Sequence, residues 1–504
     1  MTETDLTHRA HYSFRDICRR KQDRILHWDV DRAKYYVILV EYRHRATISL
    51  FFCSLLSDIL RFGGAEAVLV RQKVVALAEK GFAVLVLLLT AGALINSLLY
   101  QESEFGSYTI EGDPSIQAMW LAIYGVTLLL LVLRWKHFIG VATSNKLLLL
   151  LLGIALISVL WSAVPEVTLR RSVALAGTTL FGVYLAARFS LSEQLRLVAW
   201  ALGIAALTSF VVALILPSFG ISSGGMGGEG WRGVFDHKNN LGRLMTLSTL
   251  VFLLLAVSSR RYRWIAWAGF GLSVSLVLLS NSATALVVFL ALLTLLPLNR
   301  ALQWRHILVV PFLIGAMLLG VCIVVWLLSN ADTLLDFMGK DVTLSGRTEL
   351  WSAVVDMIGN CPWLGYGYSG FWLGREGGSA YVLLVTLSNH PHAHNGFLDL
   401  WLDLGLLGVS VFTLGFFLTF VRAISWVRLS RTTEGLWPIT YLMFMLLYNT
   451  TETTILVWNN VFWVLYVTTT LSLSIGPKWQ SKASRIRLTV SEQPRGLTVR
   501  PVHQ

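Results

Sequence analysis

The stretch LGRLMTLSTLVFLLLAVSSRRYRWIAWAGFGLSVSLVLLSNSATALVVFLALLTLLPL, residues 241–298, decides the class of fold. It holds three consecutive apolar runs, separated by the basic turn SRRYR and by a small-residue turn around Asn281. Each run has roughly 16–18 residues, which is close to the length that crosses the hydrocarbon core of a bilayer. This stretch therefore predicts three successive transmembrane helices.

Similar apolar runs recur along most of the 504 residues. The composition is 55% hydrophobic and 14% charged, with a mean hydropathy of +0.63, whereas soluble domains average roughly 25% charged residues. We therefore expect an all-α, polytopic transmembrane helical bundle of about 12 spans with a long, partly helical periplasmic loop. The expected spans lie near 82–100, 116–133, 147–164, 172–190, 197–216, 241–258, 264–281, 283–298, 307–328, 397–420, 436–451 and 454–475.

The same pattern predicts three parts of the chain. Residues 1–80 form a basic N-terminal segment that is cytosolic or lies on the membrane surface, because its apolar patch at 48–56 is too short to span. Residues 81–476 form the transmembrane domain, whose large periplasmic loop covers about 330–395. Residues 477–504 form a basic cytosolic tail.

The net charge of +12 is distributed as the positive-inside rule requires. Lysine and arginine gather in alternate loops and in the tail, which predicts a multi-pass membrane protein with both termini in the cytoplasm. The acidic stretch QESEFGSYTIEGD, 101–113, then faces outside. The start is polar, so no cleavable signal peptide is expected. Nucleic acid is not an expected partner, whereas the lipid bilayer is.

Two outside loops are rich in polar and aromatic residues. The first is FGISSGGMGGEGWRGVFDHKNN, 219–240, and the second is the long loop of about 330–395. Within the second, SGRTELWSAVVDMIGN, 345–360, has helical periodicity with Arg347 near its start. Its apolar residues are expected on one face: Leu350, Trp351, Val354, Val355 and Ile358. The glycine-rich CPWLGYGYSGFW that follows is expected to turn the chain back.

Cations are disfavoured on the outer side, so those retained there call for an explanation. Arginine presents a planar fork of donors that suits phosphate oxygens. The alternative is snorkelling to lipid headgroups, or ion pairing with Glu166 or Asp236. The candidates for phosphate binding are Arg170, Arg171, Arg232, Lys238, Arg243 at the mouth of a span, and Arg347, whereas Lys340 and Arg375 are interpreted as incidental.

The segment NHPHAHNG places three alternating histidines before an expected span: His390, His392 and His394. They could bind a metal, but no nearby Cys or Glu completes a ligand set and Pro391 disrupts a regular strand. A neutral imidazole is also the usual general base near neutral pH. We therefore expect a histidine here to act on a sugar hydroxyl.

Asn395, Asp399 and Asp403 recur every fourth residue and form one polar stripe. Such a stripe at the start of a span is expected to face the protein interior and orient the site. The alternative is a helix-capping Asn395 with Asp399 in water. Glu452, in another outside turn, is interpreted as solvated surface rather than as a site carboxylate.

Six motifs, in order, resemble those of the O-antigen ligase and Wzy-type polysaccharide polymerase superfamily, and the exopolysaccharide-polymerase branch in particular. They cover roughly residues 80–475 and read WSAVPEVTLRRS, GWRGVFDHKNNLG, LSNSATA, GRTELW, PWLGYGYSGFW and HAHNGFLDLWLDLGLLG. The resemblance implies a multi-pass glycosyltransferase of the bacterial inner membrane that is metal-independent and uses no cofactors. Its donor is an undecaprenyl-diphosphate-linked glycan, its acceptor is a second glycan, and a flippase and a chain-length regulator are its protein partners.

Carried over by motif, the catalytic residues of this family fall on Arg232, Arg347 and His394, with His392 as the alternative histidine. Substrate-binding roles then go to Arg170, Arg171, Lys238, His392, Asn395 and Asp399. The expected function is polymerisation of lipid-linked repeat units on the periplasmic face, during exopolysaccharide or O-antigen synthesis. The alternative is an O-antigen ligase acting on lipid A core. A transporter or a non-catalytic assembly component fits less well, because the polar residues gather in outside loops.

Overall fold

The computed structural model describes residues 65–93, 114–222, 229–258, 261–301, 347–430 and 432–475. The chain divides into two units, Met1–Glu79 and Lys80–Gln504, and the boundary falls within helix α3 (Ala65–Thr90). The expected span near 307–328, the tail from 477 and residues 1–64 lie outside the described residues. The functional residues considered below all belong to the second unit.

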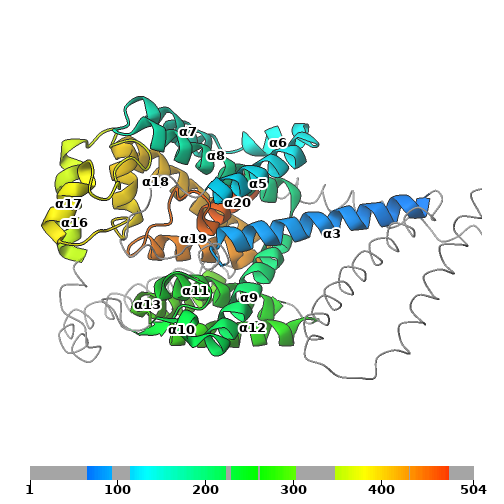
Figure 1. The fold of residues 1–504 in the computed structure, drawn as a ribbon. Coiled ribbons are helices and arrows are strands. Elements are labelled where there is room, and N and C mark those ends of the chain that lie inside the picture. Colours follow the sequence, from blue (N-terminus) through cyan, green and yellow to red (C-terminus); the bar gives the residue numbers. More distant parts are fainter. Residues whose placement is uncertain are drawn as a thin grey trace, which may run out of the picture. The chain divides into compact units, whose positions relative to one another are not determined.

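The described part of the second unit is predominantly helical (Figure 1). After α3 its helices are α5 (Pro114–Val132), α6 (Trp135–Ala142), α7 (Lys146–Ile157), η1 (Ser158–Leu160), α8 (Pro165–Arg188), α9 (Leu191–Ile215), α10 (Pro217–Gly220), α11 (Lys238–Ser258), α12 (Arg263–Leu279), α13 (Ala283–Ala301), α16 (Arg347–Asn360), α17 (Gly378–Thr386), α18 (Gly396–Ser430), η3 (Glu434–Leu436), α19 (Trp437–Tyr448) and α20 (Val461–Ile475). Two short strands, β1 (Ile221–Ser222) and β2 (Gly230–Trp231), pair antiparallel with Ile221 opposite Trp231.

The expected number of about twelve spans is not confirmed. Among the described residues, four helices are long and apolar enough to cross a membrane: α5, α9, α11 and α18. Helices α6 and α7 with η1 are bent by 88° and count as a fifth span if taken together. Helices do occupy the other expected ranges that the structure describes, but α12, α13 and α20 are shorter than a full span.

The chain between α19 and α20 departs from the expected pattern of spans. The apolar run near 454–475 reads as one span, but α20 begins only at Val461 and the preceding residues form an irregular turn. Asn449, fully buried in this turn, donates to Thr454 Oγ1 at 2.7 Å and accepts from the Thr454 backbone at 2.9 Å. Irregular backbone at membrane depth is stable only where protein satisfies its polar groups.

Helix α18 is broken at Gly405, where φ is 63°. A side chain there would adopt a strained backbone, and its Cβ would lie 2.2 Å from the carbonyl oxygen of Trp363. The turn that contains Trp363 packs directly on the break, and the Leu406 N–H donates to the Pro362 oxygen at 2.8 Å. The glycine-rich segment therefore turns the chain back, as expected, by docking on α18.

The helix predicted within 345–360 is confirmed as α16. Its inward face carries Leu350, Val354 and Ile358, which pack with Phe371 and Val382 into a small hydrophobic core separate from the main one. Val355, expected on the same face, is instead 55% exposed. This second core fixes α16, and with it Arg347, relative to the start of α18.

Candidate functional site

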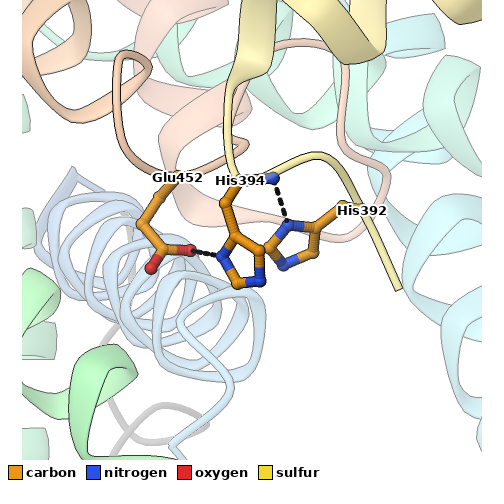
Figure 2. Close-up of side chains that lie close together, drawn as sticks. All are labelled: His392, His394 and Glu452. Atoms are coloured by element: carbon orange, nitrogen blue, oxygen red, sulfur yellow. Dashed lines mark hydrogen bonds and ion pairs between the residues drawn. The ribbon is translucent and has the colours of Figure 1, made fainter. Parts of the chain in front are cut away.

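Three segments far apart in sequence bring a histidine, a carboxylate and an arginine together. His394, in the loop before α18, places its Nδ1 3.4 Å from Oε2 of Glu452, in the turn between α19 and α20 (Figure 2). Arg347, the first residue of α16, places Nη2 3.8 Å from Oε1 of Glu452. Glu452 is therefore the common partner of two residues that the sequence analysis singled out.

Asp399 positions both sides of this cluster. It lies in the first turn of α18 and is 6% exposed. Its carboxylate accepts hydrogen bonds from the Ala393 backbone at 3.0 Å, from Trp372 Nε1 at 2.8 Å and from the Thr453 hydroxyl. Ala393 precedes His394 and Thr453 follows Glu452, so one carboxylate holds both neighbouring segments. The interpretation that leaves Asp399 in water is therefore wrong.

The His394 loop is held in a conformation that non-glycine residues rarely adopt. The φ of His394 is 50°, a strained value that persists only where surrounding contacts enforce it. The His394 N–H donates to Nδ1 of His392 at 3.1 Å (Figure 2), and Trp351 Nε1 donates to the Ala393 oxygen at 2.9 Å. Immediately afterwards, Asn395 Oδ1 accepts from the N–H of Phe397 at 3.0 Å and so caps α18.

Gly396 allows the loop to approach Glu452. Its N–H donates to the Asn449 oxygen at 2.9 Å, and a Cβ at this position would lie 2.1 Å from Asn449 Oδ1. No larger residue fits without moving the turn that carries Glu452. The sequence HNG at the start of α18 therefore sets the distance between His394 and Glu452.

The electrostatics of the cluster favour an ionised Glu452 and a neutral His392. Burial alone raises the pKa of Glu452, but the contact with His394 and the charge of Arg243 outweigh it and lower the pKa to about 2. Burial, together with the neighbouring positive charges, lowers the pKa of His392 to about 3. Burial also lowers the pKa of His237, whose charge is coupled to Glu452 and His394. Glu452 was expected to be solvated surface, but it is 7% exposed, and that interpretation is wrong.

These contacts assign the protons on the two histidines. Nδ1 of His392 accepts from a backbone N–H, so its proton is on Nε2. Nδ1 of His394 faces the ionised Glu452, which favours a proton there and leaves Nε2 as the basic nitrogen. An imidazole whose Nδ1 is oriented by a carboxylate is the usual arrangement of a general base.

His392, His394 and Glu452 also meet the distance criterion for a metal site, with potential ligand atoms within 4.8 Å of one another. Glu452 therefore supplies the carboxylate that the sequence analysis did not find. However, Nδ1 of His392 is engaged by a backbone donor, and the charges of Arg243 and Arg347 act on the cluster. Two guanidinium groups beside the carboxylate favour an anion over a cation.

The remaining predicted residues lie in their own local contacts. Arg232 Nε donates to the Phe219 oxygen at 2.7 Å, and Nη1 lies 3.5 Å from the Asp236 oxygen. Arg171 donates to the Ser369 oxygen at 2.8 Å and stacks over the Trp458 ring. The described contacts of these two arginines do not include His394 or Glu452.

Lys238 and Arg170 complete the predicted set. Lys238, at the start of α11, is 7% exposed and lies 3.3 Å from the Glu229 oxygen through its Nζ. Arg170 precedes Arg171 on α8 and is partly buried. His237 lies between Arg232 and Lys238 in sequence. The charges of Glu452 and His394 act on its imidazole, so this loop interacts electrostatically with the cluster. Roles for these residues stay predictions.

Two contributors were not identified from the sequence: His237, and Glu452, which was interpreted as solvated surface. Arg243 was identified only as an outside cation at the mouth of a span. The signal for Glu452 was the polar run NTTETT between two apolar runs. That run is also what a solvated hairpin would contain, so the pattern alone could not distinguish the two. Only the three-dimensional approach of 449–454 to the start of α18 shows the carboxylate to be enclosed.

Together, the fold and the cluster define a helical membrane protein with a histidine–carboxylate–arginine site at the ends of its helices. Residues 268–413 match the family model described as O-antigen ligase. The chain is also 26% identical over 310 residues to the exopolysaccharide production protein ExoQ of Rhizobium meliloti (strain 1021), covering 58% of this chain and 68% of that relative. These two matches agree with the resemblance to the O-antigen ligase/Wzy-like family that the sequence motifs indicate. The matched family region includes Arg347 and His394 but not Glu452.

Proposed function

We propose that this chain polymerises undecaprenyl-diphosphate-linked oligosaccharide repeat units on the periplasmic face of the inner membrane. The observation that carries this proposal is the ion pairing of Glu452 with both His394 and Arg347. It joins a candidate general base to a candidate phosphate ligand. The name of the exopolysaccharide production relative, and the family description, both concern surface glycans.

In this proposal His394 Nε2 takes the proton of an acceptor sugar hydroxyl. The hydroxyl oxygen attacks the anomeric carbon of the donor glycan, and the bond between that carbon and the diphosphate oxygen breaks. Undecaprenyl diphosphate leaves with the bonding electron pair, and Arg347 neutralises the developing charge. Glu452 keeps the His394 proton on Nδ1 and stabilises the imidazolium that forms. The step needs no oxidant, metal or nucleotide sugar.

The position of the cluster along the helices supports a site at the outer face of the membrane. His394 and Glu452 lie at the ends of α18 and α19 that adjoin the start of α11. The other end of α11, Ser258, contacts Glu434, which pairs with Arg196. The 21 residues of α11 separate these two ends by about 32 Å, close to the thickness of a membrane core. The end with Arg196 is the basic end that the positive-inside rule assigns to the cytoplasm.

A second candidate function, O-antigen ligase, is favoured by the name of the matching family model. The two differ in the acceptor, which is another lipid-linked glycan for a polymerase and lipid A core for a ligase. The cluster described above serves either acceptor, because both reactions deprotonate a sugar hydroxyl and release the same carrier.

Deletion of the gene distinguishes the two. We expect lost exopolysaccharide, or O-antigen reduced to a single repeat unit, with the polymerase. Core-only lipopolysaccharide with accumulated lipid-linked polymer would assign the ligase reaction instead. Unchanged surface glycans of both kinds would contradict the proposal.

Replacing Glu452 by glutamine is expected to lower kcat about 10- to 100-fold, the usual cost of losing a partner that orients an active group. The amide has nearly the same shape but no charge to hold the Nδ1 proton of His394 or to pair with Arg347. The measurement is polymer formed by a deletion strain that carries the variant, normalised to the protein in the membrane. Glu434→Gln is the matched control, because Glu434 also pairs with an arginine at 3.8 Å. Equal activity of Glu452→Gln and the control would remove Glu452 from the mechanism.

A further inference from the structure

Arg243 lies one turn into α11 and is held in place by its neighbours. Its Nη2 donates to Asn240 Oδ1 at 2.8 Å, and Asn240 in turn donates to Asp236 Oδ1 at 2.6 Å. The guanidinium also lies over the ring of Phe462, 4.9 Å from its centroid. A side chain fixed from two directions has already lost most of its conformational freedom before any ligand binds.

The charge of this guanidinium acts on the cluster of His394, Glu452 and Arg347. None of the motifs that carry the family resemblance includes Arg243. Its charge acts on Glu452, on His392 and on Tyr448. It therefore approaches the cluster from α11, whereas Arg347 approaches from α16. The two arginines lie far apart in the sequence. Arg347 pairs with the Glu452 carboxylate, and the charge of Arg243 acts on the same group.

Arg243 also retains donor capacity. Its Nε is buried and has no hydrogen-bond partner among the residues that the structure describes. The ion pairs described for Glu452 are those with Arg347 and His394, so its carboxylate does not saturate Arg243 through a close contact. A buried guanidinium nitrogen without a partner is costly in the free protein, and a bound anion would remove that cost.

The charge balance of the cluster also favours a bound anion. The charge of Arg243 acts on the ionised carboxylate that pairs with Arg347, and the adjacent His392 is neutral at physiological pH because its pKa is lowered. The site thus keeps an excess positive charge that is suited to an anion with several oxygens. Two arginine forks match two phosphate groups more closely than they match a single carboxylate.

We propose that Arg243 binds the diphosphate of the glycan donor together with Arg347. This inference rests on the proposed function and adds to it a second cationic residue that the resemblance did not supply. Arg347 and Arg243 hold the donor from α16 and α11, and His394 lies beside them to receive the acceptor proton. Arg243 is a binding residue here, so its loss acts mainly on donor affinity.

The test uses the purified full-length chain in lipid vesicles with a lipid-linked repeat unit as donor. Arg243→Ala is expected to raise the KM for the donor about 10- to 100-fold, the range for loss of one charged hydrogen-bonding partner. Inorganic pyrophosphate, used as a competing anion, should lose inhibitory potency by a similar factor. Arg243→Lys, which keeps the charge but not the planar fork, should fall between the alanine variant and the wild type.

Arg196→Ala is the matched control, because Arg196 also lies near a glutamate but at the far end of the helices, and its KM should match wild type. If Arg243→Ala and Arg243→Lys keep the donor KM and the pyrophosphate sensitivity of wild type while Arg347→Ala lowers kcat, the inference is overturned and the proposed function stands. If His394→Ala and Arg347→Ala also remain fully active, the proposed function itself fails. Should the alanine variant not accumulate in the membrane, the lysine variant decides the question by the same two measurements.

Discussion

Replacing His394 by alanine is expected to reduce polymer formation about 100- to 10,000-fold, the range for loss of a positioned general base. The alanine variant removes Nε2, the nitrogen left available when Glu452 holds Nδ1. It also removes the group that would carry the acceptor proton away. The measurement is the amount and chain length of surface glycan in a deletion strain that expresses the variant, with membrane protein levels determined in parallel.

His390→Ala is the matched control for this prediction. His390 belongs to the same loop, and its ring centroid lies 6.3 Å from that of His394, but its described contacts do not include Glu452. Its removal tests whether the loop tolerates loss of an imidazole, and near-normal polymer is expected. His394→Ala with full activity would exclude His394 as the base. Comparable losses in both variants would indicate that the loop structure, rather than the His394 imidazole, is what matters.

Replacing Arg347 by alanine is expected to lower kcat about 100- to 1,000-fold, as found when a donor that stabilises a developing anion is removed. The carrier diphosphate gains negative charge as the glycosidic bond to it breaks, so a guanidinium there acts more strongly on the transition state than on the bound donor. The loss should appear in kcat, unlike the loss at Arg243, which should appear in KM. Steady-state kinetics with the lipid-linked donor separate the two effects.

Arg347→Lys provides the second arm of this prediction. Lysine keeps the positive charge but not the two parallel donors, so partial activity is expected between that of alanine and wild type. Arg375, which lies in the same long loop, provides an arginine for the control variant Arg375→Ala. If Arg347→Ala lowers polymer only as much as Arg375→Ala does, Arg347 has no special role in stabilising the leaving group.

Local patterns predicted the parts of this structure that local forces determine. The periodicity of 345–360 predicted α16, since its apolar residues fall on one helical face that needs a partner. The stripe of Asn395, Asp399 and Asp403 correctly marked a polar segment at the start of α18. The glycines of CPWLGYG predicted a turn, and the turn is required because the backbone must pack against Gly405.

The rest depends on contacts between segments distant in sequence, which local patterns do not encode. A count of apolar runs assumes that each forms one straight span, but broken α18, bent α6–α7 and short α20 are stabilised by neighbouring helices. Glu452 became part of the site only because Asn449 and Thr453 dock its turn on α18. Arg232 was expected at the centre of the site, but its described contacts keep it within its own loop, whereas His237 of that loop is coupled to Glu452 and His394.

The most direct test of the central claim follows both products of the reaction with one purified protein. Wild type and His394→Ala, each in vesicles with a lipid-linked repeat unit and a chelator, are assayed for released undecaprenyl diphosphate and for new glycosidic bonds. We predict that wild type forms both in equal amounts and that the variant forms both about 100- to 10,000-fold more slowly. Equal rates in the two proteins, or carrier release without bond formation in wild type, would contradict glycosyl transfer by the His394–Glu452–Arg347 cluster.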